Sequence, residues 1–119
     1  MMLGIGTDLC QIARMERTLR NPRFLERWFT EAERAYLAGR RAESVAGLFA
    51  AKEAVAKALG VGFSGFGPAQ VEILHDENGR PVCRLYDGAL ARLTEIGGHE
   101  VLVSITHDGG LAAAFAVAQ

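Results

Sequence analysis

Residues 44–59 read SVAGLFAAKEAVAKAL and contain the clearest structural signal in the chain. The segment is rich in alanine, leucine and valine, has no proline, and is followed by Gly60, a residue type that often ends helices. Apolar residues occupy nearly every face of the predicted helix, which is typical of a helix inside a protein. We therefore expect a long central helix with the rest of the chain packed around it.

The residues before this helix predict one strand and a series of short helices. Residues 3–8 alternate glycine with apolar residues and end in Thr7-Asp8, which indicates a buried strand that delivers a carboxylate at its end. Residues 10–19 have a helical composition, and an apolar face at residues 24–29 follows the break at Asn21-Pro22. The next predicted helix has the capping box formed by Thr30 and Glu33, and runs to about Leu37.

The residues after the central helix predict a glycine-rich loop, two hairpins and one further helix. In order these are a loop at 60–68, a hairpin of 71–75 with 81–86, a helix at 87–96, and a hairpin of 101–107 with 111–118. Together with the first half, this order predicts an α+β fold, with a mostly antiparallel sheet packed around the long central helix. A length of 119 residues, half of them hydrophobic, suits a single domain spanning 1–119.

The composition excludes several classes of protein. A net charge of -1 argues against a nucleic-acid-binding protein that relies on a basic surface. No uncharged apolar segment is long enough to span a membrane. The two cysteines, Cys10 and Cys83, are too few for a disulfide framework, so we expect reduced thiols and a cytoplasmic location.

Positive charge is concentrated near the beginning of the chain. Residues 1–41 hold eight arginines against five acidic residues, although the whole chain is nearly neutral. Arg14, Arg17 and Arg20 recur at every third position and share a broad helical face. From the residue pattern alone, an ordinary solvated face is the favoured interpretation.

The polar residues of the central helix are the first candidates for chemistry. Glu53 and Lys57 lie four residues apart on one face, where they form either an ordinary helical ion pair or part of a site. Asp8 supplies a second carboxylate, and two such oxygen ligands suit magnesium; Asp8 equally suits a helix cap. His107, at the end of a predicted strand, is either structural or catalytic. The common phosphate-loop and hydrolase motifs are absent.

Several ordered motifs resemble one family, the holo-acyl-carrier-protein synthases, which are the short trimeric class of phosphopantetheinyl transferases. The resemblance covers essentially the whole chain. The matching segments are Gly4-Ile5-Gly6-Thr7-Asp8, the Arg14 helix, Arg23-Phe24-Leu25-Glu26-Arg27 with Phe29-Thr30, Phe49-Ala50-Ala51-Lys52-Glu53-Ala54 with Lys57-Ala58, Asn78-Gly79-Arg80-Pro81, and Ser104-Ile105-Thr106-His107.

This resemblance implies an enzyme that moves the 4'-phosphopantetheine group of coenzyme A onto a serine of an acyl carrier protein, in support of fatty acid biosynthesis. Asp8 and Glu53 would bind Mg²⁺, and Lys57 and His107 would lie close to the phosphates. Phosphoryl transfer requires such neutralisation of charge. Our hypothesis for the base is a carboxylate, Glu53 acting directly or through a metal-bound water. Mn²⁺ suits the same oxygen ligands.

The resemblance also implies two protein interfaces. The acidic carrier protein would dock on the arginine face, at Arg14, Arg17, Arg20 and Phe24. The family forms homotrimers with sites between subunits, so coenzyme A would contact Asn78, Gly79 and Pro81 of a neighbour. This chain departs from the family at Leu48, where many members have an arginine that holds coenzyme A. Arg40 or Arg41 is a candidate to replace it.

Two alternatives remain open at this level. One is a non-catalytic binding protein of the same fold that recognises an acidic helical partner. The other is a metal-dependent phosphohydrolase that directs the same carboxylates at water. The presence of Asp8, Glu53, Lys57 and His107 together argues against the first alternative.

Overall fold

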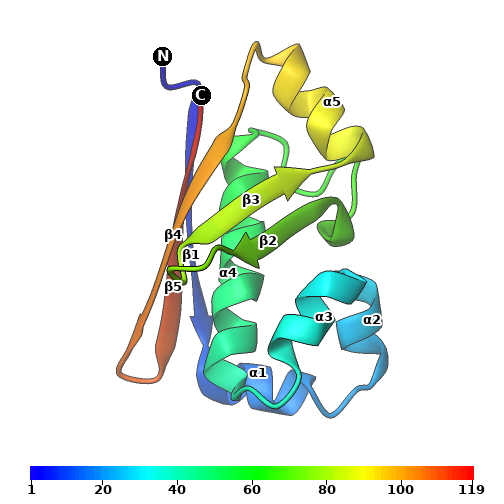
Figure 1. The fold of residues 1–119 in the computed structure, drawn as a ribbon, viewed down its shortest axis with the longest axis vertical. Helices are drawn as coiled ribbons and strands as arrows, with labels where there is room; N and C mark the ends of the chain where they lie inside the picture. The colour runs from blue at the N-terminus through cyan, green and yellow to red at the C-terminus, as the bar shows by residue number, and fades with distance from the viewer.

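The computed structural model describes residues 1–119, and Figure 1 shows how its helices and strands are arranged. The elements in chain order are β1 (Gly4–Gln11), α1 (Ile12–Thr18), α2 (Arg23–Trp28), α3 (Glu31–Leu37), α4 (Ala42–Ala58), the 3₁₀ turn η1 (Pro68–Gln70), β2 (Val71–His75), β3 (Pro81–Leu85), α5 (Asp87–Glu95), β4 (Val101–Asp108) and β5 (Leu111–Ala118). The α+β fold and the central helix predicted from the sequence are confirmed.

The strands form two antiparallel sheets rather than one. β1, β5 and β4 make a three-stranded sheet in that order, while β2 and β3 pair only with each other. The three-stranded sheet packs one face on α4, and the hairpin of β2 and β3 crosses in front of the helix, where β2 contacts α4 and β3 contacts β4 (Figure 1). Helix α4 therefore packs against both sheets.

Glycines set the close packing of β1 on α4. A methyl group at Gly4 would overlap the carbonyl oxygen of Ala58, and one at Gly6 would overlap that of Ala54. Any side chain at these positions would push the strand away from the helix. Glycine at positions 4 and 6 therefore allows the backbone of β1 to lie close to the backbone of α4.

The predicted capping box at the start of α3 is confirmed. Thr30 Oγ1 accepts a hydrogen bond from the Glu33 backbone N–H, and the Glu33 carboxylate accepts one from the Thr30 N–H. The cap satisfies two amide groups that the first turn of a helix leaves without partners. Helices α1, α2 and α3 gather around one end of α4, while α5 lies near the other end (Figure 1).

The position of Asp8 differs from the sequence-based expectation. β1 continues to Gln11 because β5 continues to pair with it as far as Leu111, so Asp8 lies inside the strand rather than at its end. The alternative role of Asp8 as a helix cap is also wrong, since the N-cap of α1 is Gln11. Asp8 instead shares the α4-facing side of β1 with Gly4 and Gly6.

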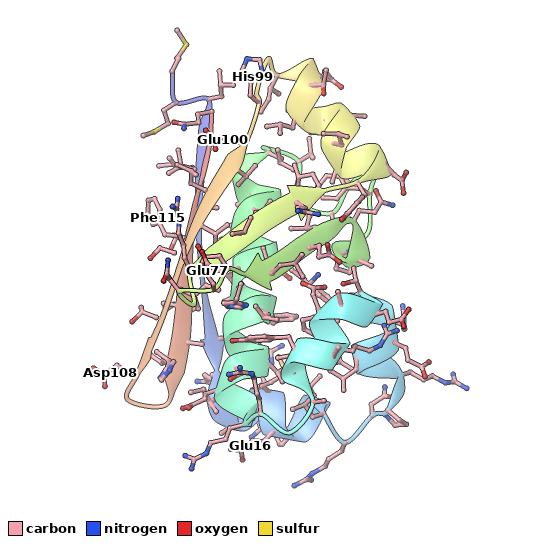
Figure 2. All side chains as sticks on the ribbon, in the orientation of Figure 1. Glu16, Glu77, His99, Glu100, Asp108 and Phe115 are labelled. Atoms are coloured by element: carbon pink, nitrogen blue, oxygen red, sulfur yellow. The ribbon has the colours of Figure 1, made fainter.

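The other face of the three-stranded sheet is apolar and uncovered. Figure 2 shows Phe115 on the side of the sheet that faces away from α4. Large side chains exposed on this face are Ile5, Leu9, Leu102, Leu111 and Phe115. None of the helices has the length and apolar composition needed to cross a membrane.

Candidate active site

Three of the predicted residues meet in one cavity. Asp8 from β1 and Glu53 and Lys57 from α4 line a cavity of about 590 Å³. Helical spacing places Glu53 and Lys57 on the same face, and the close packing at Gly6 brings β1 alongside them. The strand and the helix are both regular elements, so the three side chains stand on a rigid support.

The charges in this cavity are coupled. Lys57 Nζ lies 3.1 Å from Asp8 Oδ1 and donates a hydrogen bond to the Thr7 carbonyl oxygen at 3.0 Å. Lys57 thus pairs across to β1, and the simple helical pair of Glu53 with Lys57 is not formed. Burial raises the pKa of Glu53, the negative charge of Asp8 raises it further, and Lys57 acts in the opposite direction.

This donor set fits a divalent cation. The negative charge of Asp8 raises the pKa of Glu53. A cation bound between the two carboxylates would offset this repulsion and favour their charged forms. The chain contains no group of three or more histidine, cysteine or acidic residues arranged for a metal ion. The residues that could hold a hard ion such as Mg²⁺ are Asp8 and Glu53, because this ion keeps several water or phosphate oxygens beside one or two carboxylates.

Aromatic and basic side chains also line the cavity. Arg14 and Met15 of α1, Phe24 and Trp28 of α2, and Phe49 of α4 line it. The Trp28 and Phe49 rings have centroids 4.6 Å apart, and Phe24 lies 6.0 Å from Phe49. The cavity therefore combines charged and apolar side chains. Arg17 and Arg20 are exposed and do not line it.

His107 does not line this cavity. It lines a second cavity of about 370 Å³ together with Gly79 and Pro81. Its Nδ1 is 3.8 Å from Glu43 Oε2, and both side chains are partly exposed. Asn78 sits in the turn between β2 and β3, where its N–H donates to Asp76 Oδ1, and it lines neither cavity. Within one chain, His107 therefore lies in a different cavity from Asp8, Glu53 and Lys57.

The second cavity contains a stack that the sequence analysis missed. The Tyr36 and His75 rings are parallel, with centroids 4.2 Å apart, and the Arg40 guanidinium lies 4.0 Å above the other face of Tyr36. Arg40, one of the two candidates to replace the missing arginine, lines the same cavity as Leu48. The four-residue spacing of Tyr36 and Arg40 was a usable signal for their contact, but no local pattern links either residue to His75.

Comparisons with known proteins identify the family of the chain. Residues 4–116 match the model of the 4'-phosphopantetheinyl transferase superfamily. A holo-[acyl-carrier-protein] synthase of Clostridium beijerinckii is 48% identical over 120 residues, which cover 98% of this chain and 97% of the relative.

Solved structures are similar over the same length. The holo-[acyl-carrier-protein] synthase of Neisseria meningitidis superposes with a TM-score of 0.89 at 34% identity, covering 100% of this chain and 99% of that one. The Helicobacter pylori enzyme, solved in complex with coenzyme A, gives 0.87 at 30% identity and covers 97% and 99%. The chain therefore belongs to the 4'-phosphopantetheinyl transferase superfamily, among its holo-[acyl-carrier-protein] synthases.

Proposed function

We infer that this protein transfers 4'-phosphopantetheine from coenzyme A to a serine of an apo-acyl carrier protein. The serine oxygen forms a bond to the phosphorus next to the pantetheine arm, and the bond from that phosphorus to the bridging pyrophosphate oxygen breaks. Adenosine 3',5'-bisphosphate leaves, and the serine proton passes to a base. The observation that carries this inference is the convergence of Asp8, Glu53 and Lys57 in one cavity, in a chain of this family.

The residues of the cavity match the needs of that reaction. Lys57, about half exposed, can face a phosphate while its ammonium group is held by Asp8 and the Thr7 carbonyl. Glu53, a half-buried carboxylate that lines the cavity, is our candidate base. Mg²⁺ held by Asp8 and Glu53 would supply positive charge to the phosphates. Mn²⁺ suits the same ligands.

We assign the docking of the acidic carrier protein to the arginine face beside this cavity. Arg14 lines the cavity, Arg17 is exposed on the same helix, and Arg20 is exposed just beyond the end of α1. Phe24 adds an apolar contact at the cavity wall. Opposite charges of this kind accelerate encounter and select the partner.

We further propose that the protein is a homotrimer with active sites between subunits. The apolar outer face of the three-stranded sheet supports association, because exposed patches of this kind mark contacts between proteins. The separation of His107, Gly79 and Pro81 from Asp8, Glu53 and Lys57 supports a shared site. In such an assembly the second cavity of one subunit would complete the first cavity of its neighbour, with Asn78 at its edge.

We treat residues 1–119 as one catalytic domain and place its activity in the cytoplasm. A single apolar cluster supports the first statement, because it includes residues from α1, α3, α4 and α5, and α2 packs against it. The presence of two free cysteines, with no disulfide, supports the second.

The deciding experiment is the mass of an apo-acyl carrier protein after incubation with this protein, coenzyme A and Mg²⁺. We expect a gain of one phosphopantetheine, which disappears with the Glu53→Gln variant and after metal removal. Absence of any gain, with folded protein and several carrier proteins, would favour a binding protein. Release of adenosine bisphosphate without a carrier protein would indicate hydrolysis instead.

A further inference from the structure

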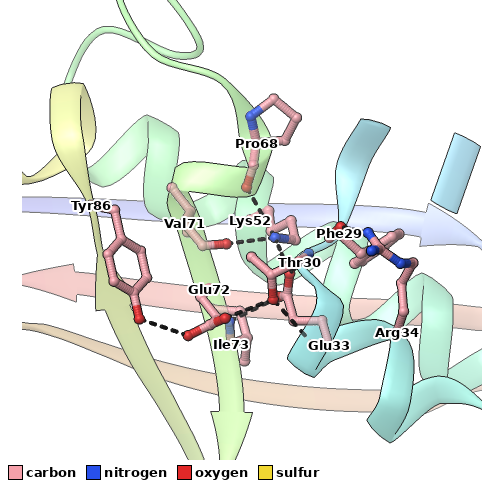
Figure 3. Close-up of polar contacts among 10 residues, drawn as sticks. All are labelled: Phe29, Thr30, Glu33, Arg34, Lys52, Pro68, Val71, Glu72, Ile73 and Tyr86. Atoms are coloured by element: carbon pink, nitrogen blue, oxygen red, sulfur yellow. Dashed lines mark hydrogen bonds and ion pairs between the residues drawn. The ribbon is translucent and has the colours of Figure 1, made fainter. Parts of the chain in front are cut away.

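A fully buried ion pair joins the helix that carries Glu53 and Lys57 to α3, and the proposed reaction does not use it. Lys52 Nζ is 2.7 Å from Glu33 Oε1, and both side chains have no exposed surface. The ammonium group also donates to the carbonyl oxygens of Pro68 at 2.9 Å and Val71 at 2.5 Å (Figure 3). All three donor positions of Lys52 are therefore used.

The Glu33 carboxylate is equally satisfied. Its Oε1 accepts from the Thr30 N–H and its Oε2 accepts from the Ile73 N–H, each at 2.9 Å. Lys52 and Glu33 together thus join α4, the start of α3, the turn η1 and strand β2. Figure 3 shows the dashed contacts converging from these segments on the lysine.

A buried ion pair of this kind is poorly explained by stability alone. Removing two charges from water is costly, and apolar residues of the same size often replace a buried pair without loss of stability. What the pair supplies is a unique arrangement, since each hydrogen bond is satisfied in one geometry only. The role of the pair therefore depends on which part of the structure it holds in place.

The neighbour of Lys52 on α4 is Glu53. Consecutive residues of a helix point in directions roughly 100° apart, so the anchor of Lys52 also sets the direction of Glu53. On the side of α4 that faces β1, close backbone packing at Gly6 sets the distance, and the polar contacts there are made by the half-exposed Lys57, to the Thr7 carbonyl and Asp8. The fully buried Lys52 anchor holds the rotation of the helix from another side.

The same anchor supports the aromatic wall of the cavity. Lys52 Nζ lies 5.2 Å from the centre of the Phe29 ring, and Phe29 directly follows Trp28 of the cavity wall. The anchored Pro68 ends the loop that carries Phe63, whose ring lies 5.5 Å from that of Trp28. Lys52 therefore contacts segments that carry aromatic residues of the cavity, and it also precedes Glu53 directly in α4.

We propose that Lys52, together with Glu33, is a positioning residue that holds Glu53 in line with Asp8. The proposal rests on the proposed function for its kinetic test, and on the geometry alone for a test by metal binding. Lys52 does not touch the substrates; it acts through the rotation of α4.

The test compares Lys52→Met, Glu33→Gln and the double variant that combines them. The single Lys52 change leaves a buried carboxylate without its partner and is the most destabilising, whereas the double variant removes both charges and keeps the volume. We expect the folded double variant to lose kcat by roughly tenfold to a hundredfold, the effect of a small displacement of a catalytic group. The KM values for coenzyme A and the carrier protein should change by less than about twofold, because the variants leave the groups that bind the two substrates in place.

A second readout needs no reaction. Binding of Mn²⁺ to the protein without coenzyme A, followed by the electron paramagnetic resonance of free Mn²⁺, should weaken in the double variant. Two controls accompany it. Tyr86→Phe removes the outer hydrogen bond of the same network, to Glu72, and should retain kcat and Mn²⁺ binding. Leu93→Ala opens a cavity in α5 and should lower stability without changing kcat per folded molecule.

The outcomes separate this proposal from the proposed function. A folded double variant with the kcat and Mn²⁺ affinity of the wild type would overturn the positioning role, even if the wild type is an active transferase. Failure of all three variants to fold would assign the pair to stability alone and would also overturn it. A wild-type protein that loads no carrier protein would refute the function, while loss of Mn²⁺ binding in the variants would still support the positioning of Glu53.

Discussion

Gly6 of β1 lies so close to Ala54 of α4 that a methyl group on its α-carbon would overlap the Ala54 carbonyl oxygen. This contact brings the strand of Asp8 against the helix of Glu53 and Lys57. The width of the candidate active site thus depends on the absence of a side chain two residues before Asp8.

The Gly6→Ala substitution should therefore disturb both stability and activity. Overpacking against a backbone oxygen cannot be relieved by a rotamer change, so we expect a loss of about 1–3 kcal/mol in the free energy of unfolding. Gly67→Ala is the matched control, because Gly67 has open space around it and a negative φ. The control should stay within about 1 kcal/mol of the wild type. Equal urea midpoints for the two variants would contradict the role of Gly6.

The Arg14→Glu substitution should impair carrier-protein docking. We expect the KM for the carrier protein to rise roughly tenfold, which corresponds to about 1.4 kcal/mol, while the KM for coenzyme A changes little. Added salt should reduce the difference between variant and wild type. Arg84→Glu, at an exposed position of β3, serves as the control. Similar effects on both KM values would count against this docking surface.

The Phe115→Glu substitution should dissociate the proposed trimer. A carboxylate on the apolar sheet face would have to be buried without a partner. We expect sedimentation to show a monomer, and transfer activity to fall although the variant leaves both cavities unchanged. Leu90→Glu introduces the same group at an equally exposed leucine of α5 and should leave the assembly intact. An active Phe115→Glu monomer would refute the shared site.

Mixing two inactive variants tests the shared site directly. If Glu53 and His107 act in the same site from different subunits, mixed trimers of Glu53→Gln and His107→Ala chains contain some sites with both residues intact. Random reassociation should restore about a quarter of the sites. Each variant reassociated alone is the control. No recovery from a mixture shown to contain hybrids would place both residues of a site on one chain.

The stability of the protein should fall in mildly acidic solution because of His75. Burial and the nearby Arg40 lower the pKa of His75 below its ordinary value of 6.5, while Asp76 acts in the opposite direction. Below 6.5 the unfolded chain therefore binds more protons than the folded one, so the free energy of unfolding decreases as pH falls through this range. His75→Phe retains the stack on Tyr36 and should reduce the decrease between about pH 7 and about pH 5. The exposed His99 provides the control, as His99→Gln should leave the pH dependence of urea unfolding unchanged.

Local signals predicted most of the fold. Helix α4 and the capping box of Thr30 with Glu33 rest on residues close in sequence, and both are found where the sequence places them. The end of β1 was wrong because it depends on how far β5 continues to pair, a property of residues a hundred positions away. The division into two sheets is equally non-local.

The candidate site was predictable only in part. Helical spacing brought Glu53 and Lys57 together, and the strand pattern of residues 3–8 added Asp8 as a second carboxylate. The second role of Glu33, as the partner of Lys52, left no mark in the sequence because the capping box already explains a glutamate at that position. The cavity that His107 lines also depends on tertiary structure. His107 lies on β4, the edge strand that β5 separates from β1.

The pairing of β1 with β5 has a consequence for how the protein is made. The ribosome synthesises the strand of Asp8 about a hundred residues before its only neighbour in the sheet. Throughout elongation the early strand, with Ile5 and Leu9, has no hydrogen-bonding partner, and such unpaired edges are prone to aggregation. The nascent chain thus cannot assemble the cavity until residues 111–118 have left the exit tunnel, and its catalytic competence should arise in one late step of folding rather than gradually during translation.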